Sequence, residues 1–153
     1  MSTEENKAIV RRIYEELWDA RKLEVADELI AEVSLNYDTG LTPVPGGPED
    51  FKAVVQMVTA GFPDNRHAVE ELIAEGDTVV ARVTLTGTNE GEFMGMPPTG
   101  KRIEVNEIHI YRLLEGKIVE HRVGRDDMGA MRQLGVIPDS VPVPGPPTPA
   151  ENV

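Results

Sequence analysis

The chain has no cysteine, and its 153 residues include only one Trp, three Tyr and three Phe. The absence of cysteine excludes disulfide bonds, thiolate catalysis and cysteine-ligated metals, and it favours a cytoplasmic protein. Long apolar runs are also absent: none approaches the roughly 20 residues that a membrane helix needs. The first residues, MSTEENK, are acidic and polar, so we do not expect a secretory signal.

Positive charge is scarce. Lys and Arg number 15 against 27 Asp and Glu, which gives a formal net charge of −12, and no basic cluster offsets it. A charge of this sign repels nucleic acid and anionic lipid, so we expect neither as a partner. The simplest role of the acidic surface is solubility.

Several catalytic motifs are missing as well. The sequence has no Walker A loop, no G-x-G-x-x-G between a strand and a helix, and no G-x-S-x-G nucleophile elbow. No pair of histidines has zinc-ligand spacing with a third ligand at hand. We therefore expect a site with no metal or organic cofactor, in which acid/base groups work in a shaped apolar pocket.

The length fits one domain with a hydrophobic core, which we expect to span residues 1–137. Residues 138–153 contain six prolines, which exclude a helix or a central strand. We expect this segment to be a disordered or polyproline tail.

The first part of the domain has helical patterns. Ser2 and Glu5 match a capping box that opens a helix over residues 2–20. Its apolar face follows the i, i+3, i+4 rule through Val10, Ile13, Tyr14, Leu17 and Trp18. The next predicted segments are a helix over 23–32, a strand over 33–38, a loop over 39–48 and a helix from Pro48 to Gly61.

From Ala68 onward the pattern changes to strands. Apolar and polar residues alternate along Thr78–Thr88. The predicted strands are 68–75, 78–88, 101–113 and 118–125, followed by a short helix over 126–134. Helices first and an antiparallel meander afterwards predict an α+β domain. We expect a curved antiparallel sheet that wraps over the N-terminal helices and encloses a conical cavity.

Ionisable side chains recur at strand positions where apolar residues would be expected, which indicates a small-molecule pocket. His109 lies between Ile108 and Ile110, and it shares its strand face with Glu107 and Tyr111. The last strand is expected to place Ile118, Glu120 and Arg122 on one face and Val119, His121 and Val123 on the other. His67 lies near a turn and is expected to be exposed. The pattern leaves open which face lines the cavity.

Asp126 is the first candidate for a general acid/base, because burial at the end of a strand would raise its pKa toward the working range. An equally good interpretation is an N-cap for the helix that follows. His109 is either a pocket residue or a hydrogen-bonded sheet residue. Arg122 is either a contact for a substrate anion or the partner of a strand carboxylate such as Glu120, and Arg82 is better explained as such a partner.

The chain resembles the SnoaL-like polyketide cyclases, also called ester cyclases, of the NTF2-like superfamily. The likeness covers roughly residues 5–137. Its motifs are 61–64 (GFPD), 74–82 (AEGDTVVAR), 87–93 (GTNEGEF), 97–101 (PPTGK), 116–121 (GKIVEH), Asp126 and 133–135 (QLG). The resemblance implies a cone-shaped fold, a homodimer or higher homo-oligomer packed through the sheet, and intramolecular aldol ring closure by an acidic residue without a cofactor.

On this basis we expect Asp126 to act as the acid/base, with His109, Asn89 or Arg122 holding the enolate oxygen. The predicted apolar wall for a small hydrophobic or aromatic ligand consists of Tyr14, Trp18, Tyr37, Phe62 and Phe93. Two residues depart from the family pattern: Asn89 replaces a His, and Arg122 replaces a Trp. These departures favour an alternative, a non-catalytic small-ligand binding protein on the same fold.

Overall fold

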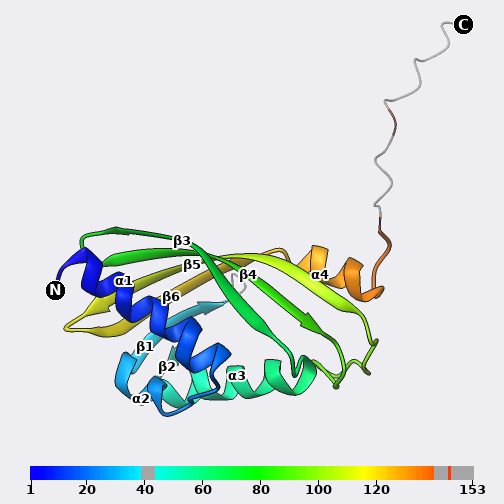
Figure 1. Cartoon of the computed structure of the whole chain (residues 1–153), viewed down its shortest axis with the longest axis horizontal. Coiled ribbons are helices and arrows are strands. Elements are labelled where there is room, and N and C mark those ends of the chain that lie inside the picture. Colours follow the sequence, from blue (N-terminus) through cyan, green and yellow to red (C-terminus); the bar gives the residue numbers. More distant parts are fainter. Residues whose placement is uncertain (39–43, 140–144, 146–153) are drawn as a thin grey trace, which may run out of the picture.

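The computed structural model describes residues 1–38, 44–139 and 145. Much of the loop expected over 39–48, and most of the tail expected over 138–153, lies outside the described residues. The rest is an α+β domain in which helices lie on a curved sheet, as the sequence predicts (Figure 1). No helix in the described part of the chain is long and apolar enough to cross a membrane.

A single six-stranded sheet runs through the domain in the order β2-β1-β6-β5-β4-β3. Neighbouring strands are antiparallel except β1 and β6, which run parallel, so the sheet is mixed rather than wholly antiparallel. A parallel pair needs a long crossover, which α3 and the β3–β5 meander supply here. The strands are β1 (Ile30–Asp38), β2 (Val44–Gly46), β3 (Arg66–Glu75), β4 (Thr78–Thr88), β5 (Arg102–Leu114) and β6 (Lys117–Arg125).

The first helix follows the prediction in position and in its cap. The Ser2 hydroxyl accepts a hydrogen bond from the Glu5 backbone at 3.1 Å, and the Glu5 carboxylate accepts one from the Ser2 backbone at 2.7 Å. The helix begins as α1 (Thr3–Arg12) and continues as a π-helical segment, η1 (Ile13–Asp19). The remaining helices are α2 (Val25–Leu29), α3 (Pro48–Gly61) and α4 (Asp127–Leu134).

The apolar face of this first helix packs on the sheet. Val10, Ile13 and Leu17 are fully buried and belong to one core cluster with residues of β4 and β5. Figure 1 shows the helix lying across the sheet, with α2 and α3 beside it and α4 at the far end. Burying apolar surface contributes about 25 cal/mol per Å², so this packing stabilises the contact between the helix and the sheet.

Two segments differ from the prediction. The helix expected over 23–32 is only α2, because Ile30 has extended backbone (φ −112°, ψ 133°) and begins β1. Strand β2 lies where a loop was expected. Its three residues include Pro45 and Gly46, which carry no strand signal of their own.

A β-bulge reverses the prediction for the last strand. Leu113 pairs with Ile118 and Arg112 pairs with Glu120, so Val119 has no partner in the register. This extra residue puts Ile118 and His121 both on the buried side, whereas alternation placed them on opposite faces.

Asp126 caps α4. Its carboxylate accepts a hydrogen bond from the Gly129 backbone at 2.8 Å, and the side chain is exposed. A Cβ atom at Gly129 would collide with this carboxylate, so the glycine makes the close approach possible. Of the two interpretations of Asp126, the N-cap is thus present in the structure.

Replacing Asp126 by Ala removes this acceptor, and we expect the free energy of unfolding to fall by about 1 kcal/mol. Asp126→Ser and Asp126→Asn keep a capping side chain and should remain within about 0.5 kcal/mol of the wild type. Urea unfolding followed by circular dichroism measures all three. Equal stability of the Ala variant and the wild type would show that the cap contributes nothing.

Candidate active site

A cavity of about 530 Å³ lies between the sheet, α3, α4 and the loop after β4. Its walls are mainly apolar. Val54, Met57 and Val58 come from α3, Met94 and Met96 from the loop, and Met131 and Leu134 from α4. The polar side chains gather on the sheet side of the cavity, where β1, β6 and β5 lie next to one another.

Strand register explains why the polar residues meet. On β5, Glu107, His109 and Tyr111 alternate onto the buried face. On the neighbouring strands, Asn36 of β1 is paired with His121 of β6, which is paired with Tyr111. One polar row therefore runs along β5 and a second crosses three strands, and both line the cavity.

Hydrogen bonds join these rows into a chain. His109 Nε2 lies 2.8 Å from Glu107 Oε2, His109 Nδ1 lies 2.8 Å from His121 Nε2, and His121 Nδ1 lies 3.2 Å from Asn36 Oδ1. The amide oxygen of Asn36 requires the proton of His121 on Nδ1, so His121 Nε2 accepts from His109. The remaining hydrogen bond of the chain joins His109 Nε2 to the Glu107 carboxylate, and one proton lies between these two groups.

The electrostatics agree with this arrangement. Burial, helped by His109, lowers the pKa of His121 well below its ordinary value, so this imidazole is neutral. Burial by itself would raise the pKa of Glu107, but the hydrogen bond and charge of His109 outweigh it and lower that pKa. The carboxyl group is therefore held in its ionised form, which is the form that can accept a proton.

Tyr14 supports the site from the helix layer. Its hydroxyl is 2.7 Å from that of Tyr111, and its ring meets His109 edge-on at 5.6 Å between centroids. Burial raises the pKa of Tyr14 well above its usual value, so the phenol stays protonated. Tyr14 thus lies behind the cavity wall, whereas Tyr111 is part of the lining.

The expectation that His67 is exposed is wrong. The residue is on β3 with 5% of its surface exposed, and its ring lies against Trp18 with 4.3 Å between centroids. The local sequence indicated a turn, but a contact with the first helix buries the ring. Both His67 and Trp18 line the cavity.

The structure brings some predicted site residues together and separates others. Trp18, Phe62, Phe93 and His109 line the cavity. The two residues that depart from the family pattern are not in the lining: the Arg122 guanidinium stacks 4.3 Å above the Tyr37 ring, which is also outside the lining.

Asn89 has a structural role, because its side chain forms hydrogen bonds that hold the loop after β4. Its side chain accepts hydrogen bonds from the backbone and hydroxyl of Thr99 at 2.8 and 3.0 Å. It also donates to the carbonyl groups of Gly91 and Gly61 at 2.9 and 3.3 Å. These bonds hold the loop that carries Phe93, so Asn89 shapes the cavity without lining it.

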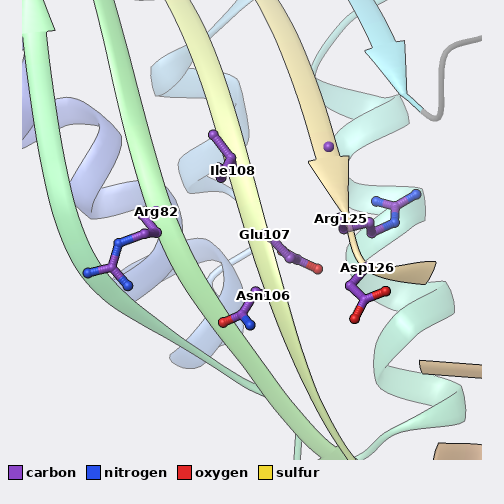
Figure 2. A pocket seen from close by; sticks show the side chains of 7 residues that line it. Arg82, Asn106, Glu107, Ile108, Arg125 and Asp126 are labelled. Carbon is purple, nitrogen blue, oxygen red and sulfur yellow. The ribbon is translucent and has the colours of Figure 1, made fainter. Parts of the chain in front are cut away.

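A smaller, open depression of about 430 Å³ is lined by Arg82, Asn106, Glu107, Ile108, Gly124, Arg125 and Asp126. Figure 2 shows the carboxyl group of Glu107 extending from β5 toward Arg125 and Asp126. Glu107 lines both the depression and the large cavity, and Asp126 lines only the depression. The carboxylate in the cavity lining next to His109 is therefore that of Glu107.

A family model, curated relatives and a solved structure point to the same family. The family model described as SnoaL-like polyketide cyclase matches residues 8–134. Aklanonic acid methyl ester cyclase DauD of Streptomyces sp. (strain C5) is 35% identical over 129 residues, which cover 83% of this chain and 80% of that protein. Nogalonic acid methyl ester cyclase of Streptomyces nogalater is 37% identical over 110 residues, which cover 71% and 82%.

The fold is shared with solved structures. A SnoaL-like protein from Jannaschia sp. CCS1 superposes with a TM-score of 0.80 at 28% identity, over 89% of this chain and 95% of that one. Sequence, family motifs and fold therefore agree over most of the chain. The protein belongs to the SnoaL-like polyketide cyclase family.

Proposed function

We propose that this protein is a cofactor-independent cyclase that closes a ring in a small aromatic polyketide by an intramolecular aldol reaction. The observation that carries the proposal is the hydrogen-bonded Glu107–His109 pair at the polar side of a largely apolar cavity. The names of the relatives specify methyl esters of aklanonic and nogalonic acid as their substrates. We infer a keto-acid methyl ester of this aromatic class for the present protein.

The reaction is an isomerisation whose protons balance within the site. The Glu107–His109 pair takes a proton from a carbon that lies next to a carbonyl group, and the electron pair moves onto the carbonyl oxygen. The resulting enolate carbon attacks a second carbonyl group and forms the new C–C bond. The alkoxide then takes the proton back from the pair.

The apolar walls contribute in two ways. Trp18, Phe62 and Phe93 offer flat surfaces against which an aromatic substrate can stack. The low dielectric of the cavity strengthens the hydrogen bonds to charge that develops on the substrate. His121 and Asn36 fix the ring of His109, because they determine which of its nitrogens donates toward β6.

The alternative of a non-catalytic binding protein rested on Asn89 and Arg122. Neither residue lines the cavity, so their departure from the family pattern does not argue against catalysis. The acid/base role predicted for Asp126 competes directly with the role that we assign to the Glu107–His109 pair.

Substitution of either member of the pair tests the assignment. We expect Glu107→Gln and His109→Gln to lower kcat by about 10²- to 10⁴-fold, because each removes the group that accepts or relays the proton. The assay follows cyclisation of aklanonic acid methyl ester by chromatography. Circular dichroism establishes that each variant is folded.

Asp126→Asn separates the two assignments, since Asn keeps the cap of α4 but cannot act as a base. Under our proposal its kcat remains within about threefold of the wild type. A large loss in Asp126→Asn with full activity in Glu107→Gln would transfer the acid/base role to Asp126.

We also propose that the protein forms a homodimer through the outer face of its sheet. Ile73, Ile108 and Ile110 lie there with 55%, 52% and 37% of their surface exposed. Ile73 and Ile110 are joined in register through Val80 of β4 and form one row, and Ile108 lies next to Ile110 on the same face of β5. Contiguous exposed apolar side chains on a sheet favour association with a second copy.

Ile108→Lys tests this interface, because each subunit would then have to bury an ammonium group in the contact. We expect the wild type to sediment at twice the chain mass of 16.8 kDa and the variant to sediment as a monomer. Val33→Lys, at an exposed position of β1 outside this row, is the matched control and should leave the dimer intact. A monomeric wild type would refute the proposal.

A further inference from the structure

His67 is a cavity residue with no assigned task. Its backbone N–H donates to Asp19 Oδ1 at 2.9 Å, which ties β3 to the end of the first helix. Its ring is held against Trp18, and the Tyr14 ring lies on another side with 6.1 Å between centroids. The imidazole is therefore fixed in orientation and almost completely removed from solvent.

Neither ring nitrogen of His67 has a hydrogen-bond partner among the described residues. Nδ1 is sealed from solvent and unpartnered. Nε2 is not sealed in this way, and the ring lines the cavity. A buried polar group without a partner costs free energy, so a nitrogen left open toward a cavity is a place for a polar ligand atom.

The protonation of His67 follows from its surroundings. Burial lowers the pKa of His67 to about 4, and the nearby carboxylate of Glu107 only partly opposes this. At neutral pH the ring is neutral and has a single N–H group. An orphaned buried N–H is rarer than an orphaned acceptor, so the sealed Nδ1 is the bare nitrogen and Nε2 has the proton. The ring thus presents an N–H donor to the cavity.

We propose that His67 is the oxyanion-binding residue, whose Nε2–H donates a hydrogen bond to the substrate oxygen that becomes negatively charged. This inference rests on the proposed cyclase function. His67 and His109 both contact the Tyr14 ring, so the donor and the proton-accepting pair lie on the same wall. When the Glu107–His109 pair takes up the proton, negative charge leaves Glu107 and appears on the substrate oxygen. A neutral imidazole stabilises that oxygen without protonating it.

None of the three residues that the sequence predicted to hold the enolate oxygen is in a position to do so. The enolate oxygen was expected to bind His109, Asn89 or Arg122. Asn89 is occupied by its loop, Arg122 lies outside the cavity, and His109 is bonded to Glu107 and His121 through its two nitrogens. In the described lining, His67 is the histidine that still has a nitrogen to offer.

The first test needs no ligand. Nitrogen-15 NMR of histidine-labelled wild-type protein should show His67 as the neutral Nε2–H tautomer at pH 7, with no titration until the pH approaches about 4. A His67→Gln sample assigns the signal. A cationic ring or an Nδ1–H tautomer at pH 7 would overturn the proposal.

The second test compares two probes of similar shape, 4-nitro-1-naphthol, which is ionised at pH 7, and its methyl ether. Calorimetry should show that the wild type prefers the naphtholate. His67→Phe keeps a ring against Trp18 but has no donor, and we expect it to lose about 10- to 100-fold in affinity for the naphtholate and less than twofold for the ether. His67→Gln, whose amide N–H can reach the position of Nε2, should recover most of the preference.

These outcomes do not depend on turnover. If the wild type shows no preference for the naphtholate, or if His67→Phe retains it, the assignment of His67 is wrong. If the wild type does not cyclise the ester while His67→Phe loses the preference, the proposed function fails and the donor assignment stands as a binding role. With an active enzyme, His67→Phe should lower kcat by about 10²-fold with little change in KM.

Discussion

The hydrogen bond between Glu107 and His109 is the interaction on which the site depends, because a carboxylate is costly to bury unless a partner compensates its charge. The position of Glu107 is dictated by β5, whose alternation turns Glu107, His109 and Tyr111 inward. His121 then has to be neutral so that it accepts from His109, and Asn36 has to present its oxygen. One buried charge thus fixes the tautomers of its neighbours.

The two faces of the sheet have different roles. The inner face combines apolar packing against the first helix with the polar rows in the cavity, and the outer face has exposed isoleucines and arginines. Arg122 is an example of this division, because it stacks on Tyr37 and pairs with Glu120 at 3.3 Å. Arg122, which departs from the family pattern, therefore changes the outer surface and not the lining of the cavity.

The sequence correctly predicted those features that depend on the pattern of neighbouring residues. Residue spacing predicted the capping box at Ser2, the alternation of β4 and the strand face of His109, and the family motifs indicated the fold. The burial of His67 depends on Trp18, which is 49 positions earlier in the chain, and the face of His121 depends on a bulge opposite Arg112. Contacts between distant segments and one-residue register shifts have no local signature.

Trp18 has a practical consequence. It is the only tryptophan in the chain, and it lies on the cavity wall against His67. All indole fluorescence of this protein therefore originates at the site. A bound aromatic molecule would replace water next to the indole, and an imidazolium in place of the neutral His67 ring would quench its emission. The native chain thus contains an optical probe of its own cavity, with no label to attach.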